Sequence, residues 1–141
     1  MNGQAAGKDY NPITDDRLIN PEANNWLSYR GTLDGWGYSA LDEINARNVD
    51  ELEPVWSFST GVLGGHESPP IVNDGVMFIT TPGNLLYAIE AATGDLLWRY
   101  QHNLPETYIA FHRTNRGVAL YGDKVYMATL DARVVALDAA T

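Results

Sequence analysis

Residues 71–93, IVNDGVMFITTPGNLLYAIEAAT, recur at residues 119–141, ALYGDKVYMATLDARVVALDAAT, as an alignment without gaps. The two copies are offset by 48 residues, the difference between positions 93 and 141. Each copy alternates β-branched and aromatic runs with turn sequences such as Asn-Asp-Gly and Pro-Gly-Asn, which is typical of short strands joined by tight turns. The repeat therefore predicts two similar units of antiparallel sheet.

Strand-like runs are not confined to the two copies. They extend from the proline at position 54 to the end of the chain. A period of about 40 to 50 residues with four short strands per unit indicates blades of a β-propeller, in which each sheet buries its faces against its neighbours. Chance similarity between two amphipathic hairpins is the alternative, and the ungapped match disfavours it. The predicted strands are residues 55–60, 75–81, 85–91, 95–101, 117–122, 124–130 and 133–139.

Composition fits one folded domain and excludes several classes of function. The chain has 141 residues, of which 45% are apolar and 11% aromatic, enough to bury a core. Nine Lys and Arg against 18 Asp and Glu give a net charge of -9, which repels nucleic acid and anionic lipid. No cysteine is present, so disulfides and thiolate metal sites are impossible. The histidines at 66, 102 and 112 lack metal-ligand spacing.

No apolar run is long enough to cross a membrane. The amino terminus lacks the basic start and apolar centre of a secretory signal, which leaves open both a cytosolic start and an exported sequence preceded by Met1. We expect three regions: an irregular arm at 1–25, a coil rich in aromatics and glycine with short helices at 26–54, and strands at 55–141. Ser39 with Asp42, and Asn48 with Glu51, resemble capping boxes that begin the two short helices.

The predicted second blade is incomplete. Its sequence ends at Thr141, whereas the first copy continues into Gly94-Asp95-Leu96-Leu97-Trp98. Two sheets with one bare flank expose apolar faces and unpaired edges. We therefore expect the remaining blades to come from the rest of a longer polypeptide or from another chain.

Residues 88–98, AIEAATGDLLW, resemble the tryptophan-docking repeat of quinoprotein propellers, the family of pyrroloquinoline quinone (PQQ) dependent alcohol dehydrogenases. The lead-in at 13–49, ITDDRLINPEANNWLSYRGTLDGWGYSALDEINARNV, is similar to that of the methanol and ethanol dehydrogenase branch. The resemblance implies an all-β, eight-bladed propeller of antiparallel four-stranded blades. It also implies that Val55-Trp56-Ser57-Phe58 is the lone strand that closes the ring, with the first two blades following it.

Two motifs carry the site that the resemblance implies. The loop GGHESPP at 64–70 is similar to the family loop whose glutamate contacts the quinone, which makes Glu67 a cofactor-binding candidate. The sequence Asn-Arg-Gly at 115–117 matches the family motif whose arginine pairs with the cofactor, here Arg116. A guanidinium suits a tricarboxylate because it forms two-pronged, charge-assisted pairs with carboxylates. Thr114 and Asn115 belong to the same candidate set.

The sequence departs from the family pattern just before this motif. Two adjacent cysteines normally form a disulfide ring against one face of the quinone, and here those positions hold Ala110 and Phe111. The phenylalanine ring offers an apolar stacking face to a planar cofactor. The alternative is that it fills the cavity of a propeller that no longer binds quinone. His112 and Arg113 have no firm role in the family.

The resemblance implies oxidation of a small alcohol to an aldehyde or ketone by a periplasmic enzyme that uses PQQ and a calcium or lanthanide ion. A cytochrome-type protein would accept the electrons. The family's catalytic aspartate and metal ligands lie on later blades, so we assign none in this chain. Two alternatives stay open: a non-catalytic propeller that serves as a scaffold for protein contacts, and one subunit of a split enzyme completed by a larger chain.

Overall fold

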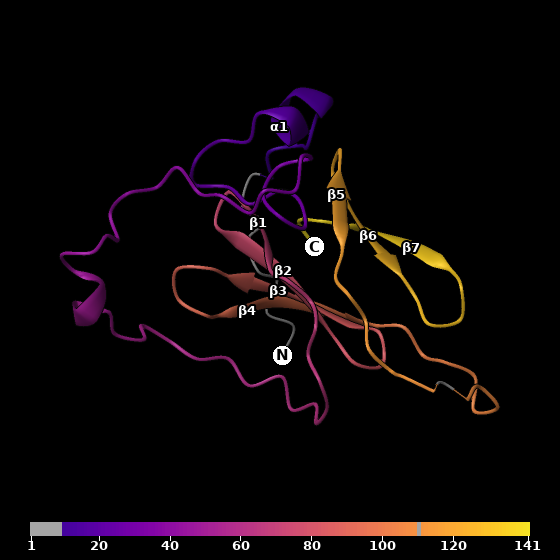
Figure 1. The fold of residues 1–141 in the computed structure, drawn as a ribbon. Coiled ribbons are helices and arrows are strands. Elements are labelled where there is room, and N and C mark those ends of the chain that lie inside the picture. The colour runs from indigo at the N-terminus through magenta and orange to yellow at the C-terminus, as the bar shows by residue number, and fades with distance from the viewer. Residues whose placement is uncertain (1–9, 110) are drawn as a thin grey trace.

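The computed structural model describes residues 10–109 and 111–141, and these residues form two antiparallel sheets (Figure 1). The first sheet has the strand order β1-β2-β3-β4 and the second the order β5-β6-β7. Neighbouring strands are also consecutive in sequence, so each sheet is a simple meander. The strands are β1 (Ile71–Asn73), β2 (Val76–Thr81), β3 (Leu85–Glu90), β4 (Leu96–Gln101), β5 (Ala119–Tyr121), β6 (Lys124–Ala128) and β7 (Val134–Asp138).

The register of the two sheets confirms the sequence repeat. Ile71 pairs with Phe78 in the first sheet, and Ala119 pairs with Tyr126, each 48 positions later, in the second. The turn after β2 reaches a positive φ of 63° at Asn84, and the equivalent Ala132 has a φ of 60°. The prediction of antiparallel propeller blades is thus confirmed at the level of individual pairs. Among the strands of the described residues, only β1 was missed.

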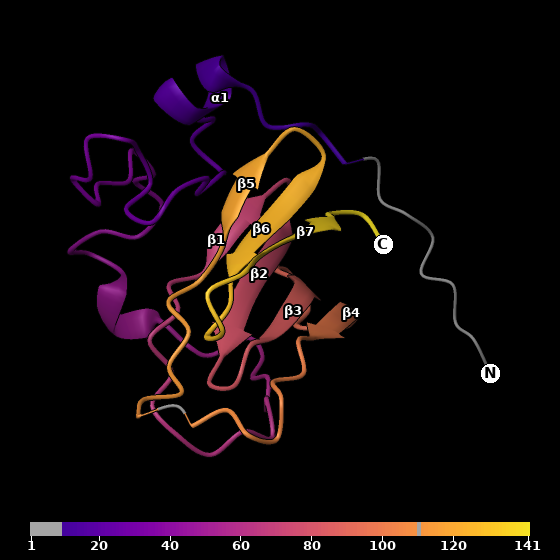
Figure 2. The ribbon, with the colours of Figure 1, turned by 90° about the vertical axis from the view of Figure 1, so that its right-hand side faces the viewer.

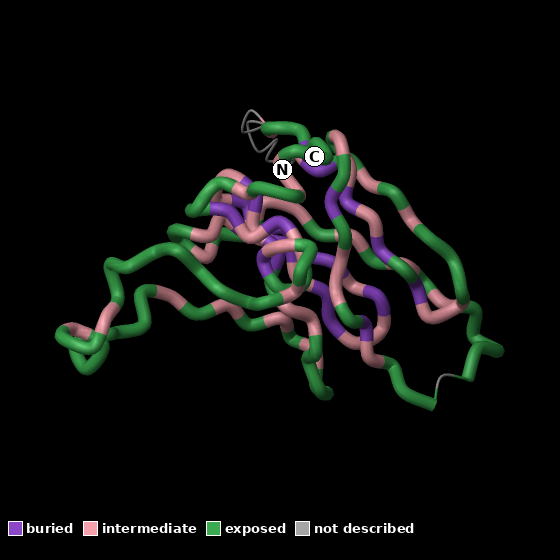
Figure 3. Tube along the Cα trace, turned by 45° about the horizontal axis from the view of Figure 1, so that its top comes forward, coloured by how far each residue is buried: buried purple, intermediate pink, exposed green. Residues whose placement is uncertain are grey.

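One hydrophobic core joins the two sheets, which lie one against the other in Figure 2. The first sheet contributes Phe78 and Leu86 and the second contributes Val125 and Met127, all buried. Each such side chain stabilises the fold by about 1.5–3 kcal/mol relative to an exposed one. In Figure 3 the buried residues follow the strands, whereas the lead-in and the loop after β4 are mainly exposed. The core therefore fixes the relative position of the two blades.

A tryptophan docks onto each sheet in the same way. The indole N–H of Trp98, on β4, donates to the carbonyl of Ala139 at 3.2 Å. Trp56 donates in the same manner to the carbonyl of Ala91 at 3.0 Å, and Ala91 is the repeat equivalent of Ala139. Trp56 therefore contacts the first sheet in the same way as Trp98, which belongs to the first sheet, contacts the second.

The expected strand at 55–60 is not formed. Trp56, Phe58 and Thr60 are half-buried and alternate with exposed residues, and the Phe58 ring contacts Tyr87 edge-on at 5.4 Å. The segment is thus extended along the first sheet by side-chain contacts. A strand also requires backbone hydrogen bonds to a neighbour, and within the part of the chain that the structure describes no strand pairs with these residues.

Residues 10–25 are more ordered than expected. Helix α1 (Asp15–Ile19) was missed, although Thr14 caps it by accepting from the Arg17 amide at 3.3 Å. Isolated bridges tie Ile13 to Gly122 and residue 26 to β1. The guanidinium of Arg17 bonds both Glu22, at 2.8 and 3.0 Å, and the Asn73 side chain at 2.9 Å. The described part of the arm therefore spans both sheets.

The two helices predicted in 26–54 were largely wrong. No helix begins at Ser39, whose hydroxyl instead accepts from the Leu41 amide. At the second position only a 3-10 turn, η1 (Val49–Glu51), forms, and the Asn48 side chain makes no cap bond to it. Short helices depend on packing of an apolar face, and here Leu41 and Val49 are more than half exposed.

Candidate functional site

The two motif loops meet at one end of the sheets. Glu67 lies in the loop before β1 and Arg116 lies three residues before β5, yet their side chains form an ion pair with Nη2 and Oε2 3.0 Å apart. The two side chains are 47% and 78% exposed, respectively. The structure thus brings together two residues for which the sequence predicted cofactor contacts. One comes from the loop before the first sheet and the other from the loop before the second.

Gly117 explains why the loops can approach so closely. Its φ is +108°, and a Cβ built there would lie 3.3 Å from the Ser68 hydroxyl and 3.5 Å from the Pro69 ring. A side chain would press against the residues that follow Glu67, and the backbone conformation itself favours glycine. The glycine of the Asn-Arg-Gly sequence therefore lets the Glu67 loop pack beside Arg116.

Asn115 faces the protein interior, in contrast to its exposed neighbour. It is 5% exposed, and its Oδ1 accepts from the Thr80 hydroxyl at 2.9 Å and from the Gly117 amide at 3.1 Å. Its Nδ2 donates to the Ala128 carbonyl at 2.9 Å and to the Asn84 side chain at 3.3 Å. Thr80 and Asn84 belong to the first sheet and its β2–β3 turn, and Ala128 belongs to β6 of the second sheet, so the Asn115 amide links the two sheets.

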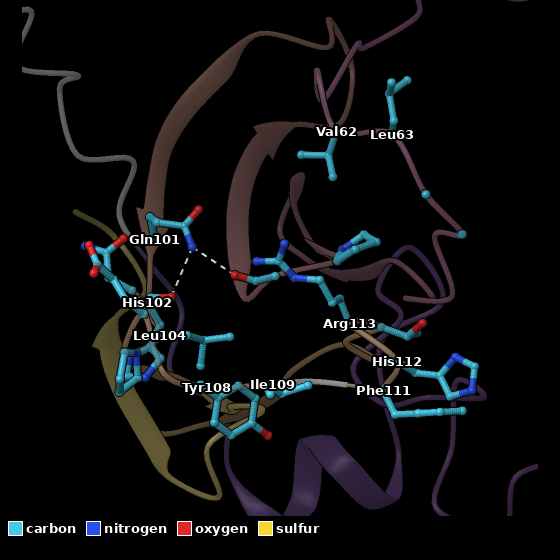
Figure 4. A pocket seen from close by; sticks show the side chains of 18 residues that line it. Val62, Leu63, Gln101, His102, Leu104, Tyr108, Ile109, Phe111, His112 and Arg113 are labelled. Carbon is cyan, nitrogen blue, oxygen red and sulfur yellow. Dashed lines mark hydrogen bonds between the residues drawn. The ribbon is translucent and has the colours of Figure 1, made fainter.

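A pocket of about 1020 Å³ opens beside this ion pair, between the loop after β4 and the loop before β1. Phe111 and Thr114, both predicted as cofactor contacts, line it, whereas Glu67 and Arg116 do not. The Phe111 ring is 95% exposed and stands edge-on to His112 at 5.1 Å. Ala110 lies outside the described residues. Figure 4 shows Arg113, for which the sequence gave no role, extending between Val62 and Gln101.

The loop that carries Phe111 is anchored at its start by contacts that the sequence did not reveal. His102 Nε2 lies 3.0 Å from the Asp131 carboxylate, and the Tyr108 hydroxyl donates to the Leu130 carbonyl. The Thr129 hydroxyl, followed by the His102 ring, lowers the pKa of Asp131 to about 2. His102 and Asp131 are 29 residues apart and belong to no motif, so only the packing of the two sheets could show the pair.

The described residues were also searched for metal and membrane sites. In residues 10–109 and 111–141, no three His, Asp or Glu side chains gather closely enough to hold a metal ion. The helices in this part of the chain are too short to cross a bilayer.

Two antiparallel sheets that each receive a tryptophan indole on an equivalent alanine carbonyl agree with the quinoprotein-type β-propeller that the resemblance implied. Residues 26–141 match the family model described as glucose/ethanol/alcohol dehydrogenase, β-propeller domain, whose short name is PQQ. The chain therefore belongs to the PQQ-dependent alcohol dehydrogenase family of β-propellers, which confirms the resemblance stated from its motifs.

Relatives and solved structures agree with this assignment. A quinoprotein ethanol dehydrogenase from Pseudomonas aeruginosa is 47% identical over 96% of this chain and 22% of its own length. The structure of the quinohemoprotein alcohol dehydrogenase ADHIIG from Pseudomonas putida matches with a TM-score of 0.84 at 37% identity, covering 92% of this chain and 20% of its own. A europium-containing methanol dehydrogenase matches with a TM-score of 0.82 at 33% identity, over 90% and 23%. The chain thus spans about a fifth of the length of the relatives it matches.

Proposed function

We propose that this chain is the amino-terminal part of a PQQ-dependent alcohol dehydrogenase and supplies one wall of its quinone site. The convergence of Glu67 and Arg116 from two sheets to 3.0 Å is the observation that carries the proposal. The names of the relatives support the cofactor class.

The residues at this site fit a planar polyanion. Arg116 forms a guanidinium–carboxylate contact with Glu67, which supports a role for its guanidinium in binding a ligand carboxylate. Because the pair is exposed, it contributes at most about 1 kcal/mol. A ligand carboxylate can therefore take a place at Arg116 without a large loss of stability. Phe111 presents an exposed ring nearby, and aromatic rings favour offset stacking on planar groups.

In this proposal Arg116 binds a carboxylate of PQQ, Glu67 accepts a hydrogen bond from the ligand or orients Arg116, and Phe111 covers one face in place of a cysteine pair. Thr114 lines the adjoining pocket and Asn115 holds the strand behind it. When bound, PQQ would supply the oxidation of an alcohol to an aldehyde or ketone, assisted by a calcium or lanthanide ion as Lewis acid. We assign the ion's ligands and the catalytic base to parts of the protein beyond these residues.

The docking of Trp56 supports a further part of the proposal. Since Trp56 contacts the first sheet as Trp98 contacts the second, residues 55–60 would form the outer strand of the blade that precedes the first in a closed ring. The remaining blades would then be the principal partner of this chain. A cytochrome-type electron acceptor and a periplasmic location belong to the same proposal.

Titration of the intact protein with PQQ and calcium, or a lanthanide, tests the proposal through quinone absorbance and through dye reduction with small alcohols. We expect Arg116→Ala to weaken PQQ binding about 10- to 100-fold, the usual effect of losing a hydrogen-bonded charge pair. Arg99→Ala, at an exposed position on β4, is the control and should change binding less than about twofold. Absence of PQQ binding by the wild-type protein refutes the function, and equal effects of the two variants refute the placement of the site.

A further inference from the structure

Thr80, near the end of β2, lies between the two motif loops. It is 1% exposed. Its amide donates to the Ser68 hydroxyl at 3.0 Å, and its own hydroxyl donates to Asn115 Oδ1 at 2.9 Å. Ser68 directly follows Glu67, and Asn115 directly precedes Arg116. One buried threonine therefore binds the neighbours of both candidate cofactor residues.

From these contacts we propose that Thr80 is a positioning residue: its hydroxyl, through Asn115, and its backbone amide, through Ser68, set the spacing of Glu67 and Arg116 and so the affinity of the site for an anionic quinone. The inference rests on the proposed function and deepens it. Thr80 does not line the pocket, so it acts on a ligand only through the two loops.

The surroundings of Asn115 make this link stiff. With Thr80 and Gly117 on its oxygen and Ala128 and Asn84 on its nitrogen, the amide can neither flip nor turn without losing partners. Loss of the Thr80 hydroxyl would leave the oxygen with the Gly117 amide alone, in a buried place. An under-satisfied buried acceptor moves toward another donor or toward water, and the backbone of Arg116 lies between Asn115 and Gly117. The guanidinium would then shift relative to Glu67.

Thr81 provides a matched control. It is adjacent on β2 and fully buried, but its hydroxyl donates only to the carbonyl of Pro82, at 3.3 Å. Successive residues of a strand point to opposite faces, so Thr81→Val removes an equally buried hydroxyl without touching Asn115.

The experiment is fluorescence titration of the intact protein with PQQ, in the presence of calcium, for wild type, Thr80→Val, Thr80→Ser and Thr81→Val. We expect Thr80→Val to weaken binding about tenfold, the effect of one lost hydrogen bond in a buried network. Thr80→Ser, which keeps the hydroxyl, and Thr81→Val should stay within about twofold of wild type. The thermal midpoint of each variant is measured without PQQ.

A positioning role differs from a purely structural one in its dependence on Arg116. If Thr80 acts through that guanidinium, Thr80→Val should have no further effect on PQQ affinity in an Arg116→Ala background. Ser68→Ala, at a half-buried loop position, tests the other end of the link if Thr80→Val does not fold, and should weaken binding about threefold with the same dependence.

Three outcomes overturn the inference without affecting the proposed function. The first is an equal PQQ affinity of Thr80→Val and Thr81→Val. The second is an equal loss of PQQ affinity on Thr80→Val with and without Arg116. The third, where Ser68→Ala is the test, is an unchanged affinity of that variant. These outcomes leave the proposed function intact, because the wild-type protein binds PQQ in each of them. A wild type that binds no PQQ overturns the proposed function and this inference together.

Discussion

Replacement of Gly94 by alanine tests the docking of residues 55–60 on the first sheet. Gly94 has a φ of +79°, and a Cβ built there would lie 2.7 Å from two indole carbons of Trp56. The left-handed conformation costs a non-glycine residue about 1–2 kcal/mol. The overlap with Trp56 adds about 1–3 kcal/mol, as overpacking of a filled site does. We therefore expect Gly94→Ala to lower the free energy of unfolding by about 2–5 kcal/mol.

Gly61→Ala separates these two contributions. Gly61 has a φ of +69°, and no heavy atom lies within 4 Å of a Cβ built there. This control carries the conformational cost of about 1–2 kcal/mol alone. Urea unfolding of the intact protein, followed by circular dichroism so that loss of a tryptophan does not alter the signal, gives both values. In a Trp56→Ala background the overlap disappears, and Gly94→Ala should cost no more than Gly61→Ala. Equal costs in the wild-type background would refute the contact between Gly94 and Trp56.

Two further predictions concern the tryptophan that docks onto the second sheet and the ion pair between Arg17 and Glu22. Trp98→Phe keeps an aromatic ring but removes the donor to the Ala139 carbonyl, so urea unfolding should show a loss of about 0.5–1.5 kcal/mol; an unchanged stability would show that the hydrogen bond contributes nothing. The hydrogen bonds from Arg17, with Asn25 second, lower the pKa of Glu22 from 4.5 to about 2. Because the folded-state pKa is the lower one, this stabilisation is present above pH 4.5 and is lost as the pH falls toward 2. Between pH 5 and 2.5 the wild type should therefore lose on the order of 1 kcal/mol more stability than Glu22→Gln, after allowance for screening of an exposed pair. Parallel pH profiles of the two proteins would contradict the assigned role of the Arg17 pair.

The sequence was most informative where residues repeat and least informative where contacts are unique. Apart from β1, the strands of both sheets could be predicted because period-2 alternation and turn residues act locally. The family resemblance named Glu67 and Arg116 as separate cofactor contacts, but it did not predict their ion pair, which joins residues 49 positions apart. The contact of Arg17 with Asn73 and the His102–Asp131 pair were missed as well, because 56 and 29 residues separate the partners. At 39–42 the prediction of a capped helix was wrong, because a capping pattern alone does not form a helix without an apolar face to pack.

The candidate site depends on positions at which the two blades stop resembling each other. Thr80 and Asn84 supply the side chains that hold Asn115, and their equivalents 48 residues later are Ala128 and Ala132. Asn84 and Ala132 share a positive φ, whereas the residues before them differ: Gly83 has a φ of +84°, and its equivalent Asp131 has no positive φ. Alanine at these positions has no polar side chain, so the second turn offers only backbone atoms, and it is the Ala128 carbonyl that accepts from Asn115. Repetition thus builds the scaffold, because each blade needs the same strands and the same docking contacts. The two copies differ in that only the first has the polar side chains that hold Asn115. Asn115 directly precedes Arg116, so these hydrogen bonds hold Arg116 beside Glu67.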